Sequence, residues 1–265
     1  MTAWRLSILV VLASSGCVAA TSRDIALLPP QAPAVPATVF VADGAGNYQL
    51  LSKALRNVVK KDGRPIDVVT HEWSHGKYRI LADYLHNDHA RIEGKRLADK
   101  MIEHRAAYPE RPIHLIGHSA GATVVVAALE NLPDDFVERA VLLAPAISAE
   151  YDVQPALRSV QSSLHVFCSP YDYVILGFAT RVLGTPDHRW TAMAGRQGFR
   201  EDPVDPKLVQ RPWQPADCVQ GNNGGHFGGY QPEFLRANVL PLFLPARDIP
   251  PQVGRARLLP SLVLR

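Results

Sequence analysis

A short apolar run near the middle of the chain ends in a Gly-x-Ser-x-Gly pattern and continues into a segment of small apolar residues. Residues 113–116 read Ile-His-Leu-Ile, the pattern spans 117–121, and the apolar segment reaches residue 131. Glycines without a Cβ allow a tight turn and close packing of a following helix. Ser119 then lies at the helix N-terminus, where unpaired N–H groups favour negative charge. The pattern predicts a strand, a sharp turn that exposes a serine hydroxyl, and a buried helix.

The rest of the chain alternates between strand-like and helix-like segments. Apolar, β-branched runs predict further strands at 38–42, 66–70, 139–144, 164–168 and 189–194. Helical spacing of apolar residues predicts helices at 48–61, about 88–108, 153–160 and 174–183. Such alternation predicts an α/β fold, with a mostly parallel central sheet and helices on both faces. Functional groups in these sheets gather beyond the carboxyl ends of the strands.

Length and composition are those of one large globular domain. The chain has 265 residues, of which 47% are hydrophobic and 20% are charged, and its net charge is +3. This excess is too small to indicate nucleic-acid binding. The sequence does not specify the oligomeric state.

The N-terminus predicts export. Arg5 precedes an apolar core at 6–13, so residues 1–20 are interpreted as a signal peptide. Cleavage after Ala20 and cleavage before a lipidated Cys17 both remain open, and they imply a periplasmic or extracellular protein and a membrane-anchored lipoprotein, respectively. A Pro/Ala-rich tether at 21–37 precedes the main domain at 38–245, and 246–265 form a tail.

Two further polar side chains follow the serine in loops. Asp172 comes just after the strand that ends at Cys168, and His226 lies in a glycine-rich loop at 221–229. Their order along the chain is Ser119, Asp172, His226. These positions favour them over the rival acids Asp187, Asp202, Asp205 and Asp217 and the rival histidines His165 and His188.

The turn at 117–121, with an acid and a histidine in this order, resembles the α/β-hydrolase superfamily of serine esterases and lipases. The resemblance covers about 38–243 and implies an acyl-enzyme mechanism on a small-molecule or lipid ester, without a cofactor. Ser119 would be the nucleophile, His226 the base and Asp172 its partner. It also implies an oxyanion hole, formed by backbone N–H groups of Ala120 and of either Gly44 or Ala45. Family members often have His-Gly where this chain has Asp43-Gly44.

Two alternative functions remain open. Residues 71–75 read His-Glu-Trp-Ser-His, which fits the zinc-peptidase pattern with His71 and His75 as ligands and Glu72 as base. That site requires a helix, whereas a β-branched run precedes the motif and Gly76 follows it. We therefore expect a strand end that leads into a loop near the active-site mouth, where Trp73 either lines the substrate pocket or, as we favour, is packed. The second alternative is a catalytically inactive binding protein with the same fold.

The remaining expectations concern a cap over the active-site pocket and the bonding of two cysteines. Only a short segment, 145–155, follows the strand at 139–144, so we expect no large cap domain and an open pocket. Residues 74–88 and 202–216 are possible partial covers. Cys168 and Cys218 are either a disulfide or two buried free thiols.

Overall fold

The structure is a computed structural model that describes residues 35–85, 87–173, 192–200 and 205–244. Val35–Arg265 form one compact unit and Met1–Ala34 another. The signal peptide, Cys17, most of the tether, the helix expected at 174–183 and the C-terminal tail therefore lie outside the described residues.

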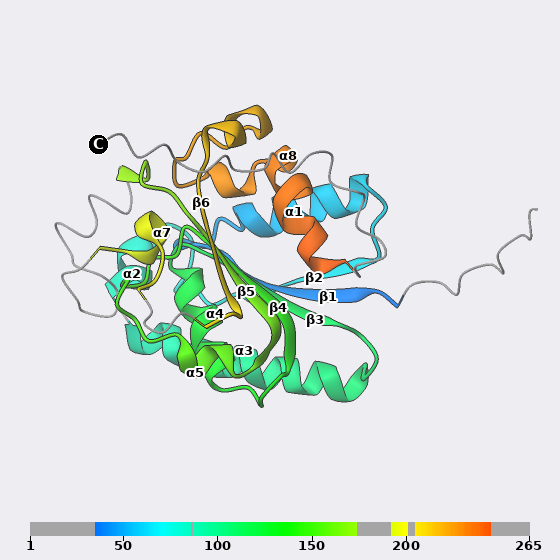
Figure 1. Cartoon of the computed structure of the whole chain (residues 1–265). Coiled ribbons are helices and arrows are strands. Elements are labelled where there is room, and N and C mark those ends of the chain that lie inside the picture. The colour runs from blue at the N-terminus through cyan, green and yellow to red at the C-terminus, as the bar shows by residue number, and fades with distance from the viewer. Residues whose placement is uncertain (1–34, 86, 174–191, 201–204, 245–265) are drawn as a thin grey trace, which may run out of the picture. The chain divides into compact units, whose positions relative to one another are not determined.

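The described residues contain one sheet of six parallel strands, as the sequence predicts (Figure 1). Its order is β2-β1-β3-β4-β5-β6. The strands are β1 (Ala37–Ala42), β2 (Ile66–Thr70), β3 (Ile113–His118), β4 (Val137–Leu143), β5 (Val160–Cys168) and β6 (Leu208–Pro212).

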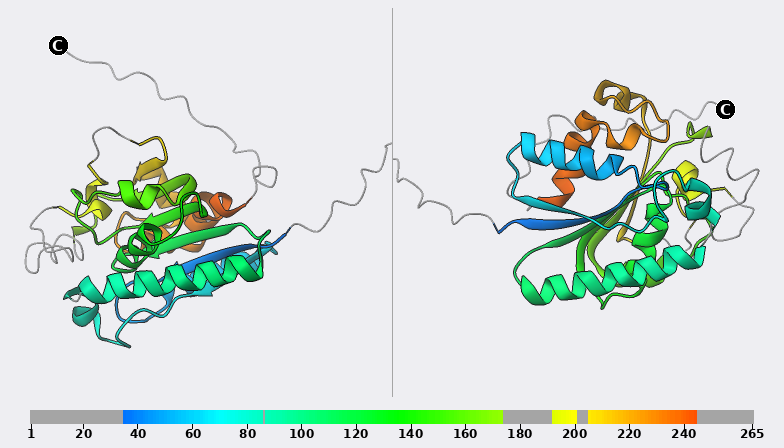
Figure 2. Two further views of the ribbon diagram at one scale, coloured as in Figure 1. Left: turned by 90° about the horizontal axis from the view of Figure 1, so that it is seen from below. Right: turned by 180° about the vertical axis from the view of Figure 1, so that it is seen from behind.

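Helices cover both faces of the sheet. The chain passes from β1 to β2 in one direction and then crosses β1 to reach β3, so right-handed connections place helices on opposite faces. Figures 1 and 2 show α1 (Leu50–Lys61) and α8 (Pro232–Phe234) on one face. The other face carries α3 (Asn87–Ala107), α4 (Gly121–Glu130) and α5 (Gln154–Leu157). The short helices are α2 (Ile80–Leu85), α7 (Ala194–Gln197), η2 (Pro215–Gln220), η3 (Gly228–Tyr230), η4 (Leu235–Val239) and η5 (Leu240–Phe243).

The sheet separates two hydrophobic cores because strand side chains alternate between its faces. In β4, Ala140 and Leu142 pack with α3 and α4, whereas Val141 and Leu143 pack with α1 and the C-terminal helices. The α4 helix is apolar nearly all round and is buried along almost its whole length. No helix among the described residues is long and apolar enough to span a membrane.

Three element predictions need correction. The strand expected at 189–194 is wrong for its described part, because Met193 makes only an isolated antiparallel bridge and α7 starts at Ala194. The sixth strand is β6 instead, inside the stretch expected to be a cover. It is a half-exposed edge strand that ends at Pro212, so its apolar signal is weak. The helix α2 was not predicted, and α5 is shorter than expected.

The strand order reverses between β1 and β3, and their carboxyl ends flank a topological switch point. Open α/β sheets bind ligands in the crevice at such a point. The loop after β1 and the turn after β3 both lie there, so the fold brings 43–47 next to 117–121.

Candidate active site

Ser119 occupies a sharp turn between β3 and α4. Its backbone has φ +53°, a conformation that non-glycine residues rarely adopt. The surroundings hold it there, because its N–H donates to the Leu143 carbonyl at 3.0 Å and its carbonyl accepts from the Ala146 N–H at 3.1 Å. A Cβ on Gly121 would lie 2.3 Å from the carbonyl oxygens of Ala42 and Asp43, so only glycine fits where α4 meets β1. The strand–turn–helix prediction is confirmed.

The structure brings Asp172 and His226 together. The His226 Nδ1–H donates to Asp172 Oδ2 over 2.6 Å, and both side chains are buried. This bond fixes the tautomer and leaves Nε2 as the basic nitrogen. The residues come from the loops after β5 and β6, more than fifty positions apart in sequence. Asp172 follows the strand that the sequence predicts, whereas the strand before the His226 loop is β6, which was not predicted.

A cavity of about 370 Å³ joins Ser119 to His226. Both residues line it, although the described residues include no hydrogen bond between the Ser119 hydroxyl and the His226 ring. Catalytic hydrogen bonds of this kind are often long without substrate. The other lining residues are mostly apolar or aromatic and include Ala45, Tyr48, Leu50, Leu51, Ile80, Phe227 and Tyr230.

Backbone donors adjoin this cavity. The N–H groups of Ala120, Gly44 and Ala45 make no hydrogen bond to any residue that the structure describes. Gly44 and Ala45 line the cavity, and a Cβ on Gly44 would lie 3.5 Å from the Ser119 Cβ. These N–H groups are therefore available to an anion beside the serine, as expected from the sequence.

In this parallel sheet, a serine turn follows β3, an acid follows β5 and a histidine follows β6. This is the order in which α/β hydrolases carry their nucleophile, acid and base. A family model described as "Serine aminopeptidase, S33" matches residues 97–182, which include the turn. The chain has the α/β-hydrolase fold.

Individual relatives of this α/β hydrolase are distant. It is 27% identical over 135 residues to the monoglyceride lipase homolog of Monkeypox virus, covering 48% of this chain and 44% of that protein. It is 26% identical over 137 residues to the monoglyceride lipase of Rattus norvegicus, covering 51% and 43%. The match thus spans less than half the length of these relatives. Among solved structures, carboxylesterase CesB from Bacillus subtilis has a TM-score of 0.42 at 13% identity, covering 79% of this chain and 84% of that one.

Two buried carboxylates position the 43–47 loop of this α/β hydrolase. Asp43 accepts from Leu51 N–H at 2.8 Å, from Ser52 N–H at 3.2 Å and from the Ser52 hydroxyl, and so caps α1. Burial raises the pKa of Asp43, and these hydrogen bonds partly offset that increase. The Trp73 indole N–H donates to the Asp43 carbonyl at 2.7 Å, which confirms that Trp73 is packed.

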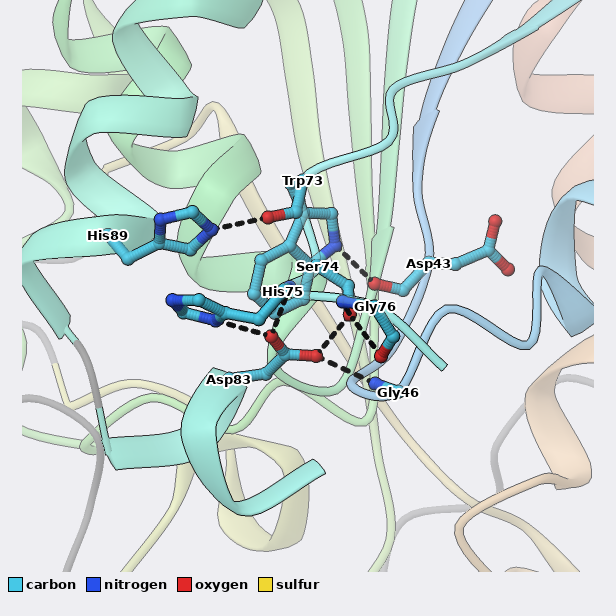
Figure 3. A network of polar contacts seen from close by, with 8 residues as sticks. All are labelled: Asp43, Gly46, Trp73, Ser74, His75, Gly76, Asp83 and His89. Atoms are coloured by element: carbon cyan, nitrogen blue, oxygen red, sulfur yellow. Dashed lines mark hydrogen bonds and ion pairs between the residues drawn. The ribbon is translucent and has the colours of Figure 1, made fainter. Parts of the chain in front are cut away.

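Asp83 of α2 is the second carboxylate and lies at the centre of the network in Figure 3. It accepts from Gly46 N–H at 2.8 Å, from the Ser74 hydroxyl at 2.5 Å, and from both the backbone N–H and Nδ1–H of His75 at 2.8 Å. Burial opposes ionisation, but these hydrogen bonds hold the pKa of Asp83 below its ordinary value. A buried anion thus links the loop beside Ser119 to residues 74–76. No local motif marks Asp83, and we did not identify it from the sequence.

His118 lies within the turn, between Gly117 and Ser119. It is buried, and its Nε2 donates to the His226 carbonyl at 3.0 Å. Burial, together with the neighbouring His226, lowers the pKa of His118 to about 3, so its ring is neutral. It therefore positions the backbone of the histidine loop without carrying charge.

The histidine loop is also supported from its other side. Asp217 accepts from Arg211 at 2.7 Å and from the Gln214 N–H at 2.9 Å, and the Trp213 indole donates to the Asn222 carbonyl at 2.8 Å. Asp217, a rival acid from the sequence, is therefore occupied with η2 and β6 rather than with His226.

The zinc-peptidase motif has no helical geometry. Residues 71–76 are non-helical, as predicted. The buried His71 lies 3.3 Å from Glu93, whereas His75 contacts Asp83 and stacks on His89. The described residues contain no group of three or more His, Cys, Asp or Glu side chains that could hold a metal ion.

The two cysteines are unbonded in the structure. Cys168 is buried at the end of β5, and Cys218 is exposed on η2. The disulfide alternative is therefore contradicted, and so is a pair of buried thiols. Sequence spacing could not distinguish these outcomes, because it does not report where two side chains lie relative to each other in the fold.

Proposed function

We propose that this α/β hydrolase cleaves carboxylic esters through an acyl-enzyme formed on Ser119. The observation that carries the proposal is the 2.6 Å bond between His226 and Asp172 beside a cavity that Ser119 also lines. A binding protein would not need an oriented base next to a strained serine.

The proposed reaction has two halves. Ser119 Oγ attacks the ester carbonyl while His226 Nε2 takes its proton, and the resulting oxyanion accepts hydrogen bonds from Ala120 and from Gly44 or Ala45. Collapse expels the alcohol, which receives the proton from His226. Water then attacks the acyl-enzyme by the same route and releases the acid. Asp172 stabilises the imidazolium in each half.

The cavity favours a neutral, apolar ester as substrate. Asp43 is the one carboxylate among its described lining residues, and its oxygens are occupied by Ser52 and by the amides of α1. The lining residues that the structure describes include no lysine or arginine. An anionic ester or a peptide N-terminal ammonium would therefore lack a charged partner there, while an apolar acyl chain would contact Leu50, Ile80 and Tyr230. The names of the two monoglyceride lipase relatives support the same class.

The test is hydrolysis of p-nitrophenyl acetate and octanoate, with an aminoacyl p-nitroanilide as the peptide-like comparison. We expect hydrolysis of both esters, a lower KM for octanoate, and no release from the anilide. Asp172→Asn should lower kcat by roughly 10⁴-fold because the histidine tautomer is lost. EDTA should have no effect. Chelator-sensitive activity that survives Ser119→Ala would contradict the proposal and support the zinc alternative.

We also propose that the chain is exported and that Cys17 is a site of lipid attachment. The support is the positively flanked apolar segment at 6–13 and the small residues before Cys17. Cys17→Ala should move the protein from the membrane fraction to the soluble fraction. An unchanged soluble fraction would instead favour cleavage after Ala20.

A further inference from the structure

Large apolar side chains are exposed together beside the mouth of the Ser119 cavity. The exposed fractions are 77% for Tyr78, 57% for Leu81, 48% for Ile80 and 47% for Leu50. We call this set, with Tyr48, the mouth patch. The Tyr78 ring meets the Tyr48 ring edge-on, with centroids 5.8 Å apart. Tyr48 and Ile80 both adjoin Gly46, so the patch is continuous.

Three members of the mouth patch, Tyr48, Leu50 and Ile80, line the cavity. The other two lie outside its lining: Tyr78 packs against Tyr48, and Leu81 directly follows Ile80 in α2. Tyr78 has φ +66°, an unfavourable conformation for a tyrosine, and yet its ring is mostly in water. Apolar surface gathered at one mouth in this way is typical of a docking site.

Basic side chains flank the mouth patch. Lys77 and Arg79 alternate with Tyr78 and Ile80, and they are exposed and make no ion pair with any described residue. Lys53 is also exposed, and its ammonium donates to the Tyr48 carbonyl at 3.1 Å. The exposed acid hydrogen-bonded to this rim is Glu72, which accepts from Gln49. The three cations outnumber it, so the surface is basic around an apolar centre.

We propose that the mouth patch docks on a lipid surface that contains anionic headgroups. The apolar side chains enter the boundary between headgroups and acyl chains, while Lys77, Arg79 and Lys53 contact the phosphates. Docking there places the cavity entrance against the lipid, so that an ester can reach Ser119 without crossing water. This surface lies on the main domain and is separate from any anchor at Cys17.

The test is sedimentation of the full chain with vesicles. Every arm carries Cys17→Ala, which removes the proposed acyl site, and Ser119→Ala, which prevents turnover. We expect stronger binding to vesicles of phosphatidylcholine mixed with phosphatidylglycerol than to pure phosphatidylcholine. Tyr78→Ser with Leu81→Ser should weaken binding to both by about tenfold. Lys77→Glu with Arg79→Glu should weaken binding about tenfold only to the anionic vesicles. Added salt should likewise weaken binding of the parent to the anionic vesicles, because it screens the same charges.

Matched controls use the same chemistry elsewhere. Val219 is 91% exposed on η2 and Tyr108 is 47% exposed, so Val219→Ser with Tyr108→Ser removes similar apolar area. Lys60→Glu with Lys61→Glu reverses two charges in the last turn of α1, away from Leu50. Neither pair should change binding. Equal losses in control and patch variants, or no binding by the parent chain, would overturn the proposal.

A separate assay distinguishes this proposal from the proposed function. With Ser119 intact, the Tyr78→Ser, Leu81→Ser variant should hydrolyse soluble p-nitrophenyl acetate like the parent. Vesicle binding without hydrolysis would leave docking intact and overturn only the esterase. Hydrolysis with no vesicle binding would overturn the docking proposal and leave the proposed esterase function intact.

Discussion

Backbone strain and buried charge in this site occur at single residues: Ser119 has a φ of +53°, and Asp83 is a buried anion. The serine could be identified from sequence because its turn needs glycines at fixed positions. Asp172 could be selected because it follows the end of a predicted strand, and His226 because it lies in a glycine-rich loop. Asp83 and His118 could not, since their roles depend on partners 37 and 108 positions away. Sequence shows that such residues are polar but not which distant group they contact.

Asp83→Asn tests whether this buried carboxylate positions the oxyanion loop. Asp83 accepts hydrogen bonds on both oxygens, so an amide NH2 in place of one oxygen would face a donor. We expect kcat for ester hydrolysis to fall roughly tenfold to a hundredfold with little change in KM, because a shifted Gly44–Ala45 backbone weakens only transition-state binding. Steady-state kinetics measure this. Asp88→Asn, in the first turn of α3, should have no effect. A folded Asp83→Asn protein with parental kcat would show that Asp83 does not position the oxyanion loop.

At the scale of elements, apolar periodicity identified the first five strands and the long helices. Apolar periodicity did not identify the edge strand β6 or the short helix α2. The edge strand β6 has only two apolar residues before Gln210, so its conformation depends on pairing with β5 rather than on its own apolar pattern. The helix α2 is short, and its position depends on Asp83 binding two loops.

The contact between α3 and α4 depends on a glycine. A Cβ on Gly94 would lie 2.4 Å from the Ala127 Cβ and 2.9 Å from α4 backbone atoms. In an exposed helix, Gly→Ala is stabilising by about 1 kcal/mol. Here we expect Gly94→Ala to lower the free energy of unfolding by about 1–3 kcal/mol, because the helices must separate. Urea denaturation measures this. Lys95→Ala, at the exposed neighbour, should stay within about 0.5 kcal/mol. A more stable Gly94→Ala protein would show that the helices are not in close contact.

For the whole molecule, the sequence predicted the α/β class that the structure shows, whereas the domain boundaries stay a prediction. The signal peptide and lipid anchor stay predictions, because they concern residues outside the part of the chain that the structure describes. The structure adds buried histidines that couple stability to pH. Burial, with Arg139 nearby, lowers the pKa of His114 to about 3.

The pH dependence follows from where the proton binds. Below about pH 6.5 the unfolded chain protonates His114, whereas the folded chain keeps it neutral until about pH 3. Its contribution to stability is therefore complete above pH 6.5 and decreases as the pH falls, by up to about 1.4 kcal/mol per unit. We expect His114→Leu to flatten the fall in unfolding free energy between pH 6 and 4 by about that slope. Urea melts across this range test it. A parental slope in the variant would mean that His114 is protonated in the folded protein.

Covalent labelling of the serine tests most directly whether Ser119 is the nucleophile. The purified protein is treated with a fluorophosphonate, and the adduct is mapped by peptide mass spectrometry. We expect a single adduct on Ser119, which His226→Ala abolishes and Ser162→Ala, at an exposed serine, leaves unchanged. An adduct on another residue, or none from protein that is folded and hydrolyses esters, would contradict a nucleophilic Ser119.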